Sequence, residues 1–309
     1  MEGILVAGPT ASGKSALAMT LAEQFGGEII NADVMQSYRE VRILSARPGP
    51  EDEKRLPHHL YGYRNAQDDA SVANWMEEAS TIIAACKKSE RVPVVVGGAS
   101  LYITCFDQGL AQIPPVPSDI RASVRERIEN EGVGACYAML EKTDPRLAQR
   151  IAPGDKQRIA RGLEVFEATG KPLTDWQEET HVEPPSRNYL RLLLEPERAL
   201  VYQRCEQRFD AMMSEGALEE VDGLRDARGD IPPALKHIHG VAPLLSHLRG
   251  EISLAKAVSA AKQHTRNYAK RQTTWARHRL GGWHRLGVGD SDETIGKALS
   301  LAKPDLIRI

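Results

Sequence analysis

The stretch Gly8-Pro9-Thr10-Ala11-Ser12-Gly13-Lys14-Ser15 decides the fold, because it fits the pattern G-x-x-x-x-G-K-[ST] of a phosphate-binding loop. The apolar run Gly3-Ile4-Leu5-Val6-Ala7 precedes it and predicts a buried strand, and apolar residues at helical spacing follow it. A helix that begins at such a loop points free N–H groups and its positive dipole end at a phosphate. The loop therefore predicts a diphosphate or triphosphate site, with Lys14 on the terminal phosphates and Ser15 on Mg²⁺.

The composition is that of an ordinary globular protein. The chain has 309 residues, 41% of them hydrophobic and 27% charged, which leaves room for one large or two modest domains. Its net charge is −2, so a polyanionic partner must be met by a local basic patch. The four cysteines form no C-x-x-C pair and are expected to be buried thiols. The first strand leaves no room for a signal peptide and no apolar run is long enough to span a membrane, so we expect a cytoplasmic protein without a membrane partner.

Alternating strand and helix patterns predict the fold class. Further strands are expected at 28–33, 92–98 and 189–194, with a helix at 71–86 between the first two. This alternation predicts an α/β fold with a parallel-sheet core like that of the P-loop NTPases. A proline-rich segment at 113–117 interrupts it, and helical patterns follow to about Gly170, one of them bounded by Asp155 and Gly170. We expect a core with a helical C-terminal part at 1–113 plus 186–309, and a helical insertion domain at 114–185.

Asp33 ends the second predicted strand. Ligands of an open parallel sheet lie beyond the carboxyl ends of its strands, so Asp33 is expected to face the same crevice as the phosphate loop. The alternative is that Asp33 only caps a helix. Gly97 and Gly98 end the next strand and are expected to let the backbone approach a ligand closely.

The segment from Leu254 to Arg279 predicts one long helix with an apolar inner face. A second stripe is basic: Lys262, Arg266, Lys270 and Arg277, with Arg271 beside it. From Lys262 to Arg285 there are seven Lys or Arg residues and no Asp or Glu. A charged stripe is usually a solvated face, but this one is interleaved with aromatic residues, which favours contact with nucleic acid or phosphate.

Six blocks occur in order between residues 3 and 283. They are Gly-Pro-Thr-Ala-Ser-Gly-Lys-Ser at 8–15, Asp-x-Met-Gln-x-Tyr at 33–38, Pro-His-His-Leu at 57–60, Gly-Gly-x-x-Leu-Tyr at 97–102, Asp-x-Gln-Arg-x-x-Arg at 155–161 and Thr-Arg-x-Tyr-Ala-Lys-Arg-Gln-x-x-Trp at 265–275. Together they resemble the tRNA dimethylallyltransferases of bacterial type. The loop alone is weak evidence, whereas the six blocks together are highly specific.

The resemblance implies transfer of a dimethylallyl group from dimethylallyl diphosphate to N6 of adenosine 37, in tRNAs that read codons beginning with U. The product is N6-dimethylallyladenosine. The loop at 8–15 would then hold a prenyl diphosphate rather than ATP, with Mg²⁺ on Ser15. Asp33 would take a proton from N6, and Thr10 would stabilise charge on the leaving diphosphate. The adenine must leave its stack to enter the site.

The resemblance also implies that the anticodon stem-loop is held by the insertion domain and by the basic helix, whose phosphate contacts position the RNA without reading its sequence. The implied tRNA-binding residues are Asp33, Val34, Met35, Gln36, Ala99, Arg121, Gln157, Arg158, Ile159, Ala160, Arg161, Arg266, Lys270 and Arg271. We expect a monomer without an obligate protein partner.

The chain departs from the family pattern in two places. Ala99 stands where the family usually has Thr, which removes a hydroxyl donor near the base. His237-Ile238-His239-Gly240-Val241 stands where the family usually has Ala-Ile-Gly-Tyr.

Three other classes of protein share part of the pattern. An enzyme that prenylates free adenine nucleotides would share the loop and Asp33, but has little use for an insertion or a basic helix. A kinase would use ATP and could place Asp33 on its metal ion. A nucleotide-switched RNA-binding protein would leave its RNA unmodified.

Overall fold

The computed structural model describes residues 2–68, 70–98, 100–179, 184–288 and 291–302. The chain divides into two compact units, Met1–Asp107 with Ser186–Ile309, and Gln108–Pro185. The second unit begins at the end of a helix, slightly before the proline-rich segment at which the sequence placed the start of an insertion. Each unit has its own hydrophobic core.

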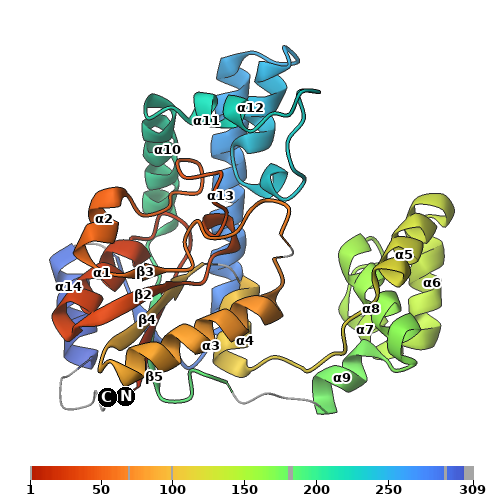
Figure 1. Cartoon of the computed structure of the whole chain (residues 1–309), viewed down its shortest axis with the longest axis horizontal. Coiled ribbons are helices and arrows are strands. Elements are labelled where there is room, and N and C mark those ends of the chain that lie inside the picture. Colours follow the sequence, from red (N-terminus) through yellow and green to blue (C-terminus); the bar gives the residue numbers. More distant parts are fainter. Residues whose placement is uncertain (1, 69, 99, 180–183, 289–290, 303–309) are drawn as a thin grey trace. The chain divides into compact units, whose positions relative to one another are not determined.

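The first unit is built on a six-stranded sheet with the order β3-β2-β4-β1-β5-β6 (Figure 1). Its strands are β1 (Gly3–Ala7), β2 (Gly27–Asn31), β3 (His58–His59), β4 (Val92–Gly97), β5 (Tyr189–Leu194) and β6 (His284–Leu286). All neighbouring strands run parallel, with Ile4 of β1 beside Val94 on one side and Leu190 on the other. The predicted α/β class with a parallel sheet is confirmed.

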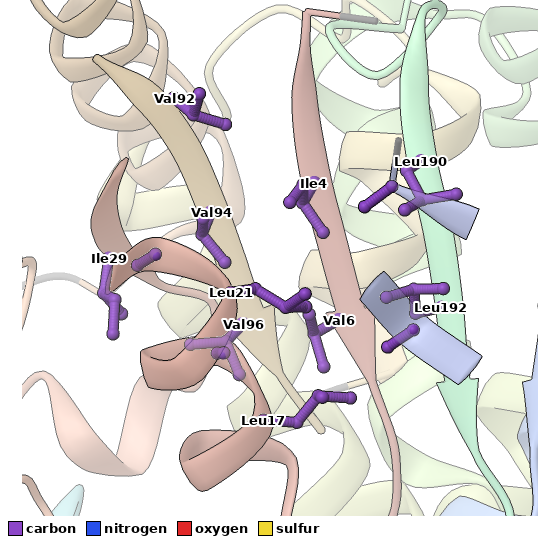
Figure 2. Close-up of a cluster of buried hydrophobic side chains, with 14 of the residues drawn as sticks. Ile4, Val6, Leu17, Leu21, Ile29, Val92, Val94, Val96, Leu190 and Leu192 are labelled. Atoms are coloured by element: carbon purple, nitrogen blue, oxygen red, sulfur yellow. The ribbon is translucent and has the colours of Figure 1, made fainter. Parts of the chain in front are cut away.

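Helices lie on both faces of this sheet (Figure 1). Those of the first unit are α1 (Lys14–Phe25), α2 (Pro50–Arg55), α3 (Val72–Lys88), α4 (Ser100–Gln108), α10 (Arg198–Ser214), α11 (Ala217–Gly223), α12 (Val241–Leu248), α13 (Leu254–Arg279) and α14 (Ser291–Leu301), with single 3₁₀ turns at Val34–Gln36 and Leu235–His237. On one face, alternate strand residues such as Ile4 and Val6 meet Leu17 and Leu21 of α1 (Figure 2). This packing fixes α1, and with it the end of the phosphate loop, against the sheet.

Helices α3 and α4 anchor the carboxyl end of β2 through one aromatic cluster. Trp75 of α3 stacks on Tyr102 of α4 with ring centroids 4.7 Å apart, and it meets the edge of Phe106. Its indole N–H also donates a 2.8 Å hydrogen bond to the carbonyl of Asn31, the last residue of β2. This hydrogen bond holds the end of β2 in place, and with it the start of the turn that carries Asp33.

Helix α13 has the bounds that the sequence predicted, and it packs against α10 and α12. Its buried positions carry small residues such as Ala257, Ala261 and Ala269, which allow the helices to approach closely. Together these helices cover the segment after β2, where Val41 and Leu44 join the same cluster.

The second unit is helical, with α5 (Ser118–Glu131), α6 (Val133–Thr143), α7 (Pro145–Arg150), α8 (Lys156–Thr169) and α9 (Leu173–Glu179). Helix α8 confirms the predicted boundaries: the Asp155 side chain accepts a hydrogen bond from the N–H of Arg158, and Gly170 ends the helix at φ 71°. Gly162 allows close packing, since a Cβ there would lie 2.6 Å from Leu140 Cδ1.

Some expectations were wrong in detail. Strand β2 ends at Asn31 rather than Asp33, because the chain turns into the 3₁₀ turn at 34–36. The short strands β3 and β6 and the helix α14 were not predicted. The four cysteines are free and buried, as expected. Within the described ranges, none of the helices is both long and apolar enough to cross a membrane.

Candidate active site

The loop at 8–15 has the backbone of a phosphate cradle. The N–H of Ser12 turns back to the carbonyl of Pro9, and Gly13 takes φ 91° immediately before α1 begins at Lys14. Ala11 also has a positive φ of 62°, which costs a residue with a Cβ about 1–2 kcal/mol. The buried Ser12 hydroxyl has no hydrogen-bond partner in the described part of the chain. The loop lines a cavity of about 490 Å³, which we call the outer cavity. These features fit an anion that accepts hydrogen bonds from the loop.

Asp33 lies on the same outer cavity as the loop and Lys14. Its Oδ1 accepts a 3.0 Å hydrogen bond from the N–H of Met35, so it caps the 3₁₀ turn as well. Asp33 therefore both faces the cavity that the phosphate loop lines and caps the 3₁₀ turn. Burial raises the pKa of Asp33, while Lys14, the Met35 N–H and Arg208 oppose that rise. Burial lowers the pKa of Lys14 to about 8, against the attraction of Asp33. A carboxylate with a raised pKa beside a phosphate cradle is suited to accept a proton during a reaction.

Asn31 holds Asp33 in place through the backbone. Its side-chain amide donates to the carbonyls of Asp33 and Leu60 at 2.8 and 2.9 Å, and its Oδ1 accepts from the Asp33 N–H at 2.8 Å. Because these bonds use the backbone of Asp33, its carboxylate is left for the Met35 N–H and for the cavity. Sequence reasoning treated Asn31 only as part of a strand.

Two residues distant in the sequence hold Thr10. Arg208 of α10 donates a 2.7 Å hydrogen bond to Thr10 Oγ1. Gln272 of α13 accepts a 2.7 Å hydrogen bond from the Thr10 N–H and donates to the carbonyl of Gly98. The sequence predicted neither role. The one indication was that Gln272, a polar residue, falls on the inner face of the helix predicted at 254–279.

The paired glycines serve close contacts within the chain. A Cβ at Gly97 would lie 2.3 Å from the carbonyl oxygen of Ala32, and one at Gly98 would lie 2.5 Å from Gln272 Nε2. The expectation that these glycines admit a ligand is therefore corrected: the groups that approach them belong to Ala32 just after β2, to the phosphate loop and to α13.

Replacing Gln272 with Leu is expected to lower the free energy of unfolding by about 2–4 kcal/mol, because it leaves the Thr10 N–H and the Gly98 carbonyl without partners. Urea denaturation followed by circular dichroism measures the change. The matched control is Gln263→Leu on the exposed face of the same helix, expected to change stability by about 0.5 kcal/mol or less. Equal effects of the two variants would contradict a stabilising role for the hydrogen bonds that Gln272 makes to Thr10 and Gly98.

A smaller space of about 50 Å³, which we call the inner pocket, adjoins the outer cavity. The two share four lining residues, Thr10, Asp33, Ser45 and Arg208. The rest of the inner pocket combines apolar and polar side chains: Met35, Leu44, Cys205, Phe209, Met212, Ile238, His239, Thr265 and Tyr268. Asp33 and Thr10 therefore stand where the space at the phosphate loop meets a smaller, partly apolar pocket.

Comparison with known proteins identifies the family. The family model described as IPP transferase matches residues 36–279, and the one described as Isopentenyl transferase matches residues 1–70. The chain belongs to the IPP transferase family. The tRNA dimethylallyltransferase of Phenylobacterium zucineum is 50% identical over 93% of this chain and 93% of that protein. The tRNA dimethylallyltransferase of Nitrobacter hamburgensis is 47% identical over 90% of this chain and 88% of that protein.

Solved structures of tRNA-modifying transferases have a fold similar to that of this chain. The full-length tRNA isopentenylpyrophosphate transferase of Bacillus halodurans has a TM-score of 0.69 and 30% identity, with 99% of this chain and 97% of that chain covered. A eukaryotic dimethylallyltransferase acting on tRNA has a TM-score of 0.82 and 25% identity, covering 97% of this chain and 77% of that chain.

The block after β2 is only partly free for RNA in this IPP transferase. The Gln36 side-chain N–H groups donate to the carbonyls of Ser45 and Ala46 at 3.0 and 2.8 Å, so its donors already hold the segment that lines the cavity. Val34 and Met35 are half-buried against the α10–α13 cluster. Ala99, the remaining expected contact near the base, lies outside the described residues.

In the second unit, the expected RNA contacts lie on α8, where some face outward and others inward, and on α5, which carries Arg121. Gln157, Arg158 and Arg161 are exposed, although Arg158 is also 3.0 Å from Asp155. Ala160 is half-buried, and Arg121 donates to the Val116 carbonyl. Ile159 is fully buried in the core of the unit, so the expectation for its side chain is wrong: a helix that turns Gln157 and Arg161 outward turns Ile159 inward.

The basic stripe of α13 is partly neutralised by α10. Lys262 pairs with Asp210 at 2.7 Å, and Arg266 pairs with Glu206. Lys270 is exposed, and Arg271 is also exposed, with its guanidinium 5.7 Å from the ring centre of Tyr268. Arg277, the last residue of the stripe, lies 3.7 Å from Glu195. The positive charge of the stripe that no ion pair of the described residues neutralises is therefore at Lys270 and Arg271.

Proposed function

We propose that this IPP transferase moves a dimethylallyl group from dimethylallyl diphosphate to N6 of adenosine 37 in tRNAs that read codons beginning with U, forming N6-dimethylallyladenosine. The observation that carries the proposal is that Asp33 shares one cavity with the phosphate loop and also lines a smaller, partly apolar pocket beside it. The relatives named tRNA dimethylallyltransferase support the same reaction.

The diphosphate is the leaving group, so negative charge grows on its bridging oxygen as the allylic C–O bond breaks. Lys14, Arg208 and the N–H groups of the loop are the donors available to that charge. Thr10 Oγ1 accepts its hydrogen bond from Arg208, which leaves the hydroxyl hydrogen of Thr10 free to donate to the diphosphate. Arg208 therefore both supplies charge and sets the direction of the Thr10 hydroxyl.

Asp33 acts on the nucleophile. The N6 amino group forms a bond to the allylic carbon, the C–O bond electrons leave with the diphosphate, and the N6 proton passes to the Asp33 carboxylate. Its raised pKa makes it a better proton acceptor than an exposed aspartate. An unpaired loop lowers the cost of turning the adenine out of its stack.

The residues at the loop also fit a magnesium ion. Ser15 is exposed, lines the outer cavity and lies in the first turn of α1, where a hydroxyl oxygen and diphosphate oxygens could share the ion's coordination. Mg²⁺ held by Ser15 would supply further neutralisation of the diphosphate.

The function is tested by supplying the protein with labelled dimethylallyl diphosphate and either tRNA or AMP, and locating the label. We expect label on the adenosine of tRNA and none on AMP. Label on AMP would favour the free-nucleotide prenyltransferase. ATP hydrolysis without prenyl transfer would favour a kinase or an RNA-binding switch.

The tRNA proposal predicts a difference within the basic stripe of α13. Lys270→Ala is expected to weaken tRNA binding and to flatten the slope of log K against log salt by about 0.7–0.9, the loss of one phosphate contact. Arg266→Ala is expected to flatten it less, because Glu206 already neutralises Arg266. Salt titrations of tRNA binding measure both slopes, with Lys297→Ala on α14 as the control. Equal slopes for wild type and Lys270→Ala would show that the stripe is a solvated face.

A further inference from the structure

Three side chains with metal-binding atoms meet at one edge of the sheet. They are Glu28 of β2, His59 of β3 and Cys86 of α3. One carboxylate oxygen, one imidazole nitrogen and the thiol sulfur all lie within 4.8 Å of one another. None of the three residues lines the outer cavity or the inner pocket, and the proposed reaction uses none of them. The cluster therefore calls for an explanation of its own.

The strands and α3 bring the three side chains to the same face of the sheet. Side chains alternate along a strand, so Glu28 shares its face with Ile30, and His59 of the edge strand is the register partner of Ile30. Cys86 is buried in the last turn of α3 and approaches Glu28 from that helix. Because the three residues belong to separate elements, no short sequence motif indicates that they meet.

The distances suit ligands of one ion. Cys86 Sγ lies 3.6 Å from Glu28 Oε2, and His59 Nε2 lies 2.7 Å from the same oxygen. Atoms that bind Zn²⁺ tetrahedrally at about 2.0–2.3 Å lie roughly 3–4 Å from one another. The separation of His59 from Glu28 has to widen by roughly 1 Å to reach that range, which a small rotation of either side chain provides.

The donor set selects the kind of metal. Thiolate and imidazole are ligands that suit Zn²⁺, whereas Mg²⁺ is bound by oxygen. The Glu28 carboxylate and a Cys86 thiolate carry two negative charges, which match the charge of a divalent ion. The other carboxylate oxygen, Oε1, lies 3.6 Å from Arg91 Nε, so Arg91 orients the carboxylate from outside the ligand set. The His59 side chain is 31% exposed, which gives an ion and a water molecule access from one side.

We propose that Glu28, His59 and Cys86 form a zinc site with a water molecule as the fourth ligand. On binding, the Cys86 thiol gives its proton to solvent, and His59 binds through Nε2 as the neutral imidazole with its hydrogen on Nδ1. The ion would join β2, β3 and α3. Since β3 has only two residues, a metal bond to His59 adds to the few contacts that hold this strand at the edge of the sheet. The site takes no part in prenyl transfer, and the inference does not depend on the proposed function.

The test uses Co²⁺ as a probe, because a cobalt–thiolate bond gives a charge-transfer absorption band that oxygen and nitrogen ligands alone do not give. Protein freed of metal with EDTA is titrated with Co²⁺. We expect wild type to develop the band with one Co²⁺ per chain, and we expect Zn²⁺ but not Mg²⁺ to remove it. In Cys86→Ala the band should be absent. In His59→Gln, the Kd for Co²⁺ should rise by more than about 100-fold, since even partners outside the ligand set contribute about 10- to 100-fold to metal affinity.

The matched control is Cys105→Ala, which removes another buried, free thiol, on α4, and should leave both the band and the Kd unchanged. Circular dichroism checks that each variant is folded, and His59→Gln tests the site with all four thiols kept. Absence of the band in wild type would overturn the inference, and so would a band that persists in Cys86→Ala or an equal Kd in wild type and His59→Gln. Each of these results would show that Glu28 and His59 are only a hydrogen-bonded pair beside a buried thiol.

Discussion

Asp33→Asn is expected to lower kcat by roughly 10²–10⁴-fold, because an amide does not accept the N6 proton at neutral pH. The structure predicts that the fold around it is kept. The Met35 N–H donates to Oδ1, which the amide retains, and the bonds from Asn31 go to the backbone of Asp33. The loss should therefore be chemical, with little change in affinity for an anticodon stem-loop.

Single-turnover prenylation with labelled dimethylallyl diphosphate measures this loss, and a fluorescent anticodon stem-loop reports binding. Asp222→Asn on α11 is the matched control, since Asp222 is exposed and its side chain pairs with the neighbouring Arg225 on the surface. If Asp33→Asn turned over within about threefold of wild type, another group would have to take the proton and the role of Asp33 would be wrong.

The features that the sequence predicted are those carried by contiguous residues. A phosphate loop needs a strand, eight residues and a helix start in one stretch, and all three are local patterns. The sequence also predicted the ends of helices α8 and α13 correctly, because helix caps and the spacing of apolar residues are local patterns as well. Strand β3, with only two residues, and β6, with three, are too short to show a period and exist because neighbouring strands pair with them.

The residues that the sequence missed act across long separations. Arg208 and Gln272 reach Thr10 over 198 and 262 residues, and nothing in their own segments indicates that partner. The ion pairs of the basic stripe were missed for the same reason, since the acidic residues that neutralise Lys262 and Arg266 belong to α10. Ile159 was a different error: only the resemblance grouped it with RNA-binding residues, and its side chain is fully buried in the core of the second unit.

Arg208→Gln is expected to lower kcat/KM by roughly 10²–10⁴-fold and to shift its pH profile to higher pH. The loss arises because the diphosphate loses a buried cation, while the glutamine amide can still donate to Thr10 Oγ1. The pH shift has two parts. Arg208 lowers the pKa of Asp33, so its removal raises that pKa, and a higher pH is needed to ionise the base. Arg208 also lowers the pKa of Lys14, which is about 8, so its removal keeps Lys14 charged to higher pH.

The variant Arg204→Gln distinguishes the shift of the pH profile from the loss of a positive charge near the diphosphate. Arg204 lies one turn earlier on α10 and lines the same outer cavity, but it is not among the groups that shift the pKa of Asp33 or Lys14. Its removal should weaken diphosphate binding and leave both limbs of the profile of kcat/KM against pH in place. For Arg208→Gln both limbs should move upward together, since one cation acts on the base and on the lysine with the same sign. A profile that falls in height without moving would mean that Arg208 binds the diphosphate from outside the electrostatic reach of Asp33, and the assignment of Arg208 to the reaction centre would then fail.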